Sequence, residues 1–392
     1  MNVTAAFPCI EREIPRYLDF WKEIVRLESP SWDRAAVCAV ADCIAQFAAA
    51  QGFTVDRTPQ PRAGDTLRIT LPGTLDAPPV ALMAHMDTVH PVGSFGDPVV
   101  RAENGVLYGP GVFDCKGGIA VGLLCMDALH RCGVPHPEVR LVLDPDEENG
   151  TYIGEAGGQF IRDAVQGCMA ALNLESGRDG SLTVGRKGVL RAELTVRGIA
   201  AHAGNDYFSG ASAIREAAHK ILELERISSP EGITVNCGLI RGGSAVNTVP
   251  EDCTVDIDVR FKNEAQQEEA LAHLRRVAEA AFVPGVSASL RVLHIHPAMA
   301  CTAANLHLFE TVSGLARELG LEDLVPMERG GCSDSAYPVQ LGIPTVCSLG
   351  PIGRYEHTLQ EQADIGTLGT RAKLLTAVIL HLAAANETED PK

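Results

Sequence analysis

The stretch DPDEENGT at residues 144–151 places four carboxylic acids within five positions, directly after the apolar run VRLVL. The four acids are Asp144, Asp146, Glu147 and Glu148. Like charges this close repel one another and raise one another's pKa values, so a structural role is disfavoured unless a cation or a proton-transfer task stabilises the cluster. The sequence therefore predicts that a positive group binds near the end of a buried strand.

Other histidines and acids occupy similar positions along the chain. His85 and Asp87 end the run VALMAHMD, Asp114 follows the glycine-rich GPGVF, Glu175 ends AALNLE, and His357 lies in the loop after PTVCSLG. In an open parallel sheet the carboxyl ends of the strands lie along one crevice, where such folds bind ligands. Residues this far apart in the sequence can therefore converge on one site.

The residue types in this set are two imidazoles and several carboxylates, without a thiolate. Such donors suit zinc or a related divalent ion. Two histidines and three acids are enough for two metal ions if one carboxylate bridges them. A metal pair about 3.5 to 4 Å apart can polarise a carbonyl and supply a nucleophile at neutral pH, and amide hydrolysis requires both. Each motif alone is common, but five motifs at strand ends favour a metal centre.

The surrounding patterns predict the elements that position these residues. Apolar β-branched runs alternate with helical patterns up to about residue 185, which is typical of an α/β domain with a mostly parallel sheet flanked by helices. Strands are expected in TLRITLPG, PPVALMAHMD, EVRLVLDP and CMAALNLE, and a helix with a glycine-rich start in KGGIAVGLLCMDALHRCG. The same pattern resumes after residue 301 and ends in a long helix from about 361 to 385.

The middle of the chain follows a different order. Residues 188–301 give a β-α-β-β-α-β pattern, the α+β ferredoxin-like arrangement, whose sheet has one face without helices. We therefore expect two domains: a catalytic domain formed by residues 1–187 and 302–392, and an inserted domain over residues 188–301. A chain of 392 residues also exceeds the roughly 250 to 300 residues that one core supports.

Composition excludes several classes of partner. The formal net charge is -17 and no run is rich in lysine or arginine, which argues against nucleic acid or an anionic membrane surface as partner. The first residues lack a basic segment followed by an apolar one, and no run of about 18 apolar residues occurs, so we expect a cytoplasmic protein. The 12 cysteines are scattered without a C-x-x-C pair, and we expect reduced thiols that neither form disulfides nor bind metal.

Five segments together carry a resemblance to a known family. MAHMDTV, GPGVFDCKGG, DPDEENGT, NLESGRDG and YEHT, in this order and with a domain inserted before the last, resemble the dinuclear zinc aminoacylase and carboxypeptidase family. Its members include glutamate carboxypeptidase, acetylornithine deacetylase, succinyl-diaminopimelate desuccinylase and several dipeptidases. The resemblance covers essentially the whole chain and implies a zinc-peptidase catalytic domain with a lid and dimerisation domain inserted.

The resemblance also implies a role for each residue of the metal centre, which would hold two zinc ions, with Co²⁺ or Mn²⁺ as substitutes. His85 and Glu175 would bind one ion, Glu148 and His357 the other, and Asp114 would bridge them. Asp87 would orient the ring of His85. Glu147 would be the general base, so that one glutamate of the pair binds metal while its neighbour moves protons.

Residues of the inserted domain are also implied by the resemblance. His202 matches the lid histidine that reaches the active site of the partner subunit in a homodimer, although a plain loop histidine is the alternative. Asn247, Arg260 and Arg329 match segments that bind the substrate carboxylate, a task suited to the planar fork of arginine. For Arg260 and Arg329 the alternative is an ordinary salt bridge.

Two features of the sequence favour the glutamate carboxypeptidase branch: Arg329 directly before its glycine pair, and the DEE-x-G form of the acidic segment. This branch releases a C-terminal amino acid, often glutamate, from a peptidyl or acyl precursor. An N-acyl-amino-acid deacylase or a dipeptidase would keep the same metal residues. An inactive metal-binding regulator is the alternative of another class. One departure is Cys115, because relatives often have Asp or Met there, next to a peptide bond that is usually cis. Cys115 is either a space-filling residue or a redox-sensing thiol.

Overall fold

The structure is a computed structural model that describes residues 2–149, 155–178, 180–321 and 323–389. Gly150, Thr151 and Asp179, which belong to the quoted motifs, lie outside these residues. The chain forms two compact units. The first comprises Met1–Val184, Cys301–Glu328 and Ser333–Lys392, and the second Gly185–Ala300 and Arg329–Cys332. The expected domain boundaries, after residues 187 and 301, lie close to this division.

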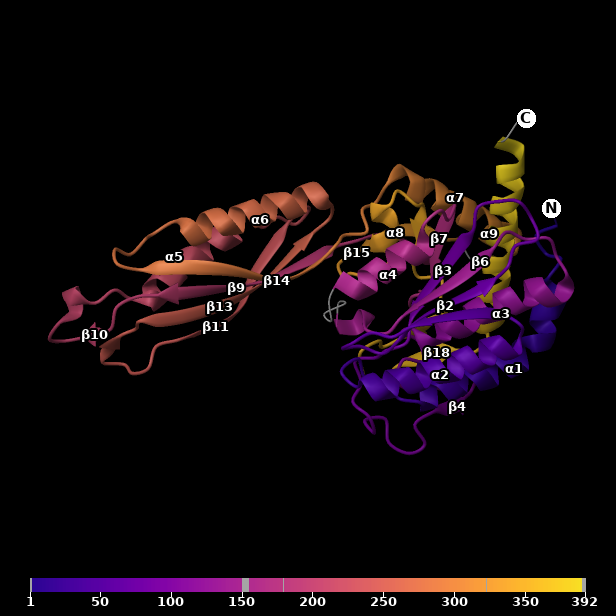
Figure 1. The fold of residues 1–392 in the computed structure, drawn as a ribbon, viewed down its shortest axis with the longest axis horizontal. Helices are drawn as coiled ribbons and strands as arrows, with labels where there is room; N and C mark the ends of the chain where they lie inside the picture. The colour runs from indigo at the N-terminus through magenta and orange to yellow at the C-terminus, as the bar shows by residue number, and fades with distance from the viewer. Residues whose placement is uncertain (1, 150–154, 179, 322, 390–392) are drawn as a thin grey trace. The chain divides into compact units, whose positions relative to one another are not determined.

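The first unit is built on a six-stranded sheet (Figure 1). Its strands, in spatial order, are β1 (Thr54–Thr58), β2 (Thr66–Leu71), β6 (Val139–Asp144), β3 (Val80–His85), β7 (Ala170–Asn173) and β16 (Thr345–Val346). The pairings among β6, β3, β7 and β16 are parallel, and those of β1 and β2 are antiparallel. This agrees with the expected mostly parallel sheet.

Helices cover both faces of this sheet, which explains why its central strands are apolar throughout. Leu82 and Leu141 belong to the large core on one face, whereas Met83 and Val142 belong to a smaller core on the other face. The large core lies beneath α1 (Phe7–Arg26), α2 (Arg34–Ala50), α3 (Lys116–Cys132) and α9 (Thr367–Glu389). The smaller core includes residues of α4 (Glu155–Val165) and α8 (Ala336–Gln340). Helix α7 (Ala303–Glu318) packs on β16 and α9.

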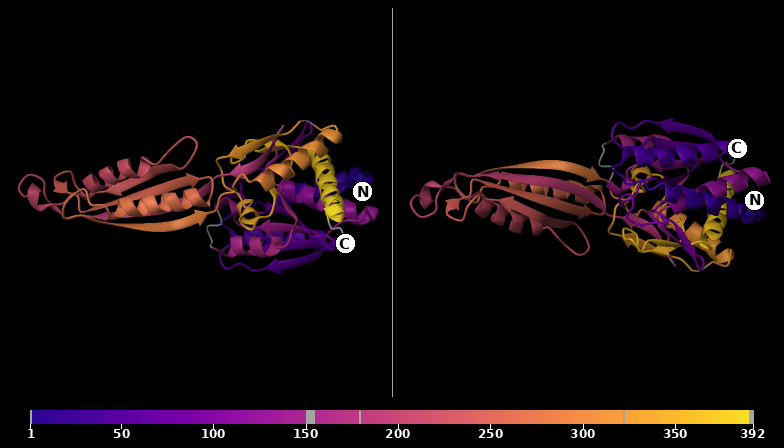
Figure 2. Two further views of the ribbon diagram at one scale, coloured as in Figure 1. Left: turned by 90° about the horizontal axis from the view of Figure 1, so that it is seen from above. Right: turned by 90° about the horizontal axis from the view of Figure 1, so that it is seen from below.

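A small second sheet in the same unit was not expected from the sequence. Its strands are β17 (Gly353–Arg354), β18 (Gln362–Asp364), β5 (Val106–Tyr108) and β4 (Arg101–Glu103). The residues predicted to begin the last helix form β18 instead, and α9 begins only at Thr367. This helix is long and apolar enough to cross a membrane, but 67% of its most apolar window is buried and it packs against α1 and α3 (Figure 2), so it is a core helix.

One expectation about cysteines is wrong. Cys9 near the start of α1 and Cys132 at the end of α3 form a disulfide that joins residues 123 positions apart. The two helices pack along each other, which brings the two side chains together; neither cysteine lies in a motif that predicts pairing. The other ten cysteines form no disulfide in the structure.

The second unit has the expected β-α-β-β-α-β order. A four-stranded antiparallel sheet is formed by β11 (Thr234–Gly242), β13 (Asp252–Phe261), β9 (Gly188–Arg197) and β14 (Ser287–His296). Both helices, α5 (Ala213–Glu225) and α6 (Glu264–Glu279), pack on one face (Figure 1). Two further short strands of this unit, β10 (Ala201–His202) and β12 (Thr248–Val249), pair with each other. The chain passes from one unit to the other within or near β8 (Ser181–Arg186) and β15 (Val325–Arg329).

Candidate metal centre

The register of the central strands places several expected residues at one edge of the sheet. His85, the last residue of β3, lies beside Asp144, the last residue of β6, and Met83 lies beside Asn173 at the end of β7. The chain segments that leave these three strands therefore start side by side. Asp87, Glu147, Glu148 and Glu175 all stand within four residues of a strand end.

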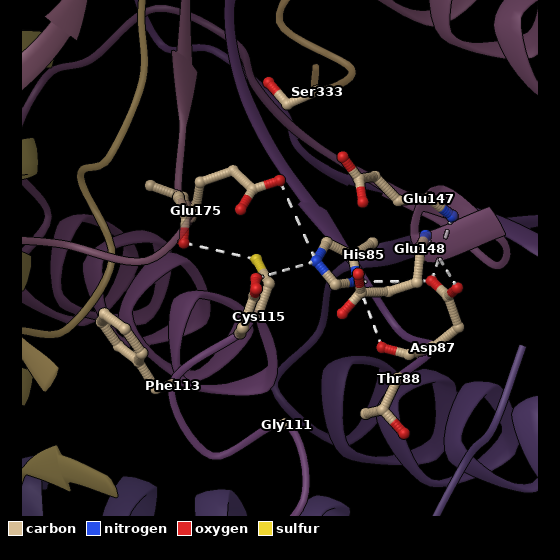
Figure 3. Close-up of polar contacts among 12 residues, drawn as sticks. His85, Asp87, Thr88, Gly111, Phe113, Cys115, Glu147, Glu148, Glu175 and Ser333 are labelled. Atoms are coloured by element: carbon tan, nitrogen blue, oxygen red, sulfur yellow. Dashed lines mark hydrogen bonds and ion pairs between the residues drawn. The ribbon is translucent and has the colours of Figure 1, made fainter. Parts of the chain in front are cut away.

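Asp87 connects two of these segments. Its buried carboxylate accepts a hydrogen bond from the Ser31 hydroxyl at 2.6 Å, and from the backbone N–H groups of Glu147 and Glu148 at 3.2 and 3.1 Å. Asp87 Oδ1 also lies 3.3 Å from Nδ1 of His85 (Figure 3). One carboxylate thus holds the DEEN segment against the strand that carries the histidine, and leaves Nε2 of His85 to face the other acids.

Asp114 has a histidine on each side. Its Oδ1 lies 3.2 Å from Nε2 of His85, and its Oδ2 lies 3.3 Å from Nε2 of His357. Each histidine has a further carboxylate: Glu175 Oε1 is 3.9 Å from His85, and Glu148 Oε2 is 3.0 Å from His357. The five side chains therefore form two sets of donors that share Asp114, as a bridging carboxylate between two metal ions requires.

The electrostatics of the cluster agree with this arrangement. Burial alone would raise the pKa of Asp114, but hydrogen bonds from His357 and His85 lower it far below its usual range. Hydrogen bonds to Asp114 and Glu148 raise the pKa of His357 to about 10, and burial together with the charge of Asp114 raises the pKa of Glu148 to about 7. Protons on Glu148 and His357 would offset part of the excess negative charge, and divalent cations would do so more completely, so the residues fit a metal pair.

Glu147 lies beside the ligand set. Burial raises the pKa of its carboxyl well above the usual value, and the charge of Glu175 adds to this effect. Figure 3 shows the carboxylates of Glu147 and Glu175 pointing toward the same region next to the His85 ring. A carboxyl group with a raised pKa accepts and returns a proton more readily than an ordinary glutamate, which is the property that a general base and acid needs.

Cys115 is close to the cluster as well. Its sulfur and the ligand atoms of His85 and Glu175 lie within 4.8 Å of one another, but its S–H donates to the Leu174 carbonyl at 3.4 Å. Burial raises the pKa of this thiol well above its usual value, so it is a protonated, packed side chain. The Asp114–Cys115 peptide bond is cis, as the family resemblance implied.

The residues that hold the loops of Asp114 and His357 were not predicted from the sequence. Glu361 is buried and accepts hydrogen bonds from three backbone N–H groups of the loop that ends at Asp114. Arg178, just after Glu175, forms an ion pair with Glu356, the neighbour of His357. Only the position of Glu361 four residues after the histidine of YEHTLQEQ could have indicated it, and nothing local indicates the Arg178–Glu356 pair.

Two of the expected lid residues lie together in the second unit. His202 is in β10 and pairs with Thr248 of β12, directly after Asn247. The His202 side chain is exposed, and its Nδ1 accepts hydrogen bonds from the backbone N–H groups of Gly204 and Asn205, both at 3.1 Å. Because Nδ1 is the acceptor, the neutral ring carries its proton on Nε2, which is available as a donor.

The two expected arginines also belong to the second unit. Arg260 makes a two-pronged ion pair with Asp258 on the same strand, at 2.7 and 3.1 Å. Its fork is therefore engaged within the lid, which is the salt-bridge alternative that the sequence left open. Arg329 ends β15, and its carbonyl accepts a hydrogen bond from the backbone N–H of Lys187 at 3.0 Å.

Comparisons with known proteins agree with this geometry. The family model described as Peptidase family M20/M25/M40 matches residues 81–381, which include all five expected metal ligands. Carboxypeptidase G2 from Pseudomonas sp. (strain RS-16) is 26% identical over 385 residues, 96% of this chain and 92% of that protein. Succinyl-diaminopimelate desuccinylase from Thioalkalivibrio sulfidiphilus is 27% identical over 395 residues, 93% of this chain and 98% of that protein.

Solved structures show the same fold. The aminopeptidase PepT from Bacillus cereus superposes with a TM-score of 0.79 at 23% identity and covers 94% of this chain and 99% of that one. The YXEP protein of Bacillus subtilis, described as a dinuclear metal-binding peptidase, superposes with a TM-score of 0.70 at 18% identity and covers 96% and 99%. The chain therefore belongs to peptidase family M20/M25/M40 and is a hydrolase of the metallopeptidase class.

Proposed function

We propose that the enzyme uses two zinc ions to hydrolyse an amide bond next to a free carboxylate, releasing a C-terminal amino acid, with glutamate favoured, from a peptidyl or acyl precursor. The observation that carries the proposal is the position of Asp114 between His85 and His357, each with its own acid. The full-length similarity to carboxypeptidase G2 supports the choice of reaction.

His85, Glu175, Asp114, Glu148 and His357 would hold the ions. When bound, such a pair polarises the scissile carbonyl and lowers the pKa of water, which are the two requirements of amide hydrolysis. Asp87 keeps the ring of His85 in one orientation and fixes the backbone from which Glu147 and Glu148 extend. The protein thus keeps the base and one ligand in a constant relation to the histidine.

Glu147 moves the protons in this proposal. Its carboxylate takes a proton from the attacking water and then delivers it to the leaving nitrogen. The raised pKa of its carboxyl makes it able to hold that proton between the two steps. One residue can serve both steps because the carbon that the water attacks is also the carbon from which the amine leaves.

We further propose that His202 acts across a homodimer formed through the lid. The Nε2 proton of its neutral ring can donate to the negative oxygen that develops on the substrate carbonyl. The substrate carboxylate is proposed to bind to Asn247 and Arg329. Asn247 directly precedes β12, the strand of the same chain that pairs with His202. Arg260 already pairs with Asp258, so it would join them either through its remaining N–H groups or by exchanging Asp258 for the substrate.

A second candidate is N-acyl-amino-acid deacylation, favoured by the desuccinylase that matches over 93% of this chain. The two reactions share the metal centre and differ in which side of the amide bond the pocket recognises. A panel of folyl-glutamate, N-acetyl and N-succinyl amino acids, and simple dipeptides separates them when assayed with zinc-loaded enzyme.

The same panel tests the proposal as a whole. We expect folyl-glutamate to be cleaved fastest, a chelator to abolish the activity, and added zinc to restore it. Faster cleavage of the acyl amino acids would favour the second candidate. A zinc-loaded protein that hydrolyses no member of the panel would contradict both and favour a metal-binding regulator.

A further inference from the structure

We propose that Glu361 is a positioning residue that holds the backbone of the Asp114 loop and thereby sets the affinity for both metal ions. The inference rests on the proposed metal centre. It concerns a residue whose hydrogen bonds go to backbone N–H groups and to His90, not to the expected ligand side chains, and which acts through the backbone of the bridging residue. Its support comes from four hydrogen bonds, from the strand register, and from the way the loop is built.

Glu361 is buried, and both of its carboxylate oxygens are engaged. Oε1 accepts hydrogen bonds from the backbone N–H groups of Phe113 and Asp114 at 2.9 and 3.0 Å. Oε2 accepts from the backbone N–H of Gly111 at 3.0 Å and lies 2.9 Å from Nε2 of His90. Four donors therefore converge on one side chain, and one of them is the backbone N–H of the bridging residue itself.

The loop is shaped so that these donors can face inward. Gly111 has φ +71°, and a Cβ atom on it would lie 2.6 Å from Cγ2 of Thr88, so only glycine fits there. The Val112 carbonyl accepts a hydrogen bond from the Trp21 ring at 3.0 Å, which turns the other side of the loop toward α1. Glu361 accepts from three backbone N–H groups of this loop, and leaving any of them unpaired in the interior would cost free energy of folding.

The register of the small sheet places Glu361 at this loop. Gln362 of β18 pairs with Tyr108, the last residue of β5, and the loop that leads to Asp114 begins directly after this strand. The segment that carries Glu361 also carries His357, four residues earlier. Glu361 therefore links the bridging carboxylate to the segment of one histidine, and because Asp114 faces both histidines, displacement of its backbone would disturb both ion sites.

Only a carboxylate satisfies all of these donors. In Glu361→Gln the amide NH₂ group replaces one oxygen and must face backbone N–H donors, so at least one buried donor loses its acceptor. Loss of a group that orients a metal ligand typically weakens metal binding about 10- to 100-fold. We expect a weakening of this size for both ions in Glu361→Gln.

Glu216 of the lid supplies a matched control. It is also a buried glutamate whose carboxylate accepts backbone N–H hydrogen bonds, from Phe282 and Val283 at 3.0 and 2.7 Å. Glu216→Gln therefore makes the same chemical change in a unit that holds none of the expected metal ligands. Both variants should lower the Tm, but only Glu361→Gln should change metal affinity.

The experiment is a zinc titration of metal-free full-length protein against a competing chelator, at a temperature where circular dichroism shows each variant folded. Glu361→Gln should bind zinc about 10- to 100-fold more weakly than wild type, Glu216→Gln should match wild type, and Glu361→Asp, which keeps the charge on a shorter side chain, should recover part of the affinity. A Kd for Glu361→Gln within about twofold of wild type would overturn the proposal.

Two further outcomes are decisive. If Glu361→Gln does not fold, the Glu361→Asp titration decides instead, and an unchanged Kd in that variant overturns the proposal. Because the titration uses no substrate, a wild-type protein that binds two ions but hydrolyses nothing would overturn the proposed function and leave the positioning role to be decided by the Kd ratio.

Discussion

The two units bury acidic groups in opposite ways. In the lid, the buried Glu216 carboxylate lies 3.1 Å from the ammonium of Lys220, which also donates to the carbonyls of Val277 and Ala278 at 2.7 and 3.0 Å. The charges are balanced and the hydrogen bonds are complete. In the catalytic unit, the acids at the strand ends outnumber the cationic groups that contact them. Balanced buried charge stabilises a fold, whereas an excess of one sign indicates a ligand of the other sign.

The units also expose different groups. The catalytic unit buries His85, Asp87 and Glu175 at its strand ends, while the lid leaves His202 and Asn247 on its surface. A buried site can enforce metal geometry, and an exposed histidine can act only on something brought to it. This difference fits the proposed division of labour, in which the catalytic unit would supply the metals and the base, and the lid would supply recognition.

The largest effect on turnover should come from Asp114→Ala. Because each oxygen of Asp114 faces a different histidine, its removal should release both metal ions and reduce hydrolysis to background. Metal content per chain, measured by elemental analysis, checks this expectation. Retention of one full metal equivalent would show that Asp114 serves one ion only.

Glu147→Gln should have the next largest effect. The amide keeps the size of the side chain but cannot carry the proton, so kcat should fall by about 10²- to 10⁴-fold while metal content stays near that of wild type. Metal analysis beside steady-state kinetics distinguishes a base from a ligand. Loss of one metal equivalent would reverse the assignment of Glu147 and Glu148.

His202→Ala should reduce kcat by about 10²- to 10³-fold, the cost of one donor to a developing oxyanion, without loss of metal. If His202 serves the partner subunit, a mixture of inactive Glu147→Gln and His202→Ala chains should regain activity after subunit exchange, since some heterodimers then contain one intact site. A mixture that remains inactive after demonstrated exchange would show that each chain uses its own histidine.

Lys220→Met should have the smallest effect on turnover and a large one on stability. It leaves Glu216 buried without its partner, which costs about 3–5 kcal/mol, while metal content should not change. Chemical denaturation measures the loss. The double variant with Glu216→Gln should recover part of it, and a single variant that loses metal would contradict the structural role assigned to this pair.

The sequence by itself determined the fold class and where the reactive residues lie along it. Buried strands show as apolar runs, and acids or histidines that follow such runs must gather at one edge of a parallel sheet, as His85, Asp87 and Glu148 do. The inserted domain was visible because its order of strands and helices differs from that of its surroundings.

Only the tertiary structure decided how these residues are held. Glu361 and Asp114 are 247 positions apart, and their contact depends on the pairing of β18 with β5, short strands without a strong local pattern. The Cys9–Cys132 disulfide likewise depends on how α1 packs along α3. Hydrophobic periodicity records which face of an element is buried, but it does not record which element lies against that face, and hydrogen bonds between distant loops are set by that choice.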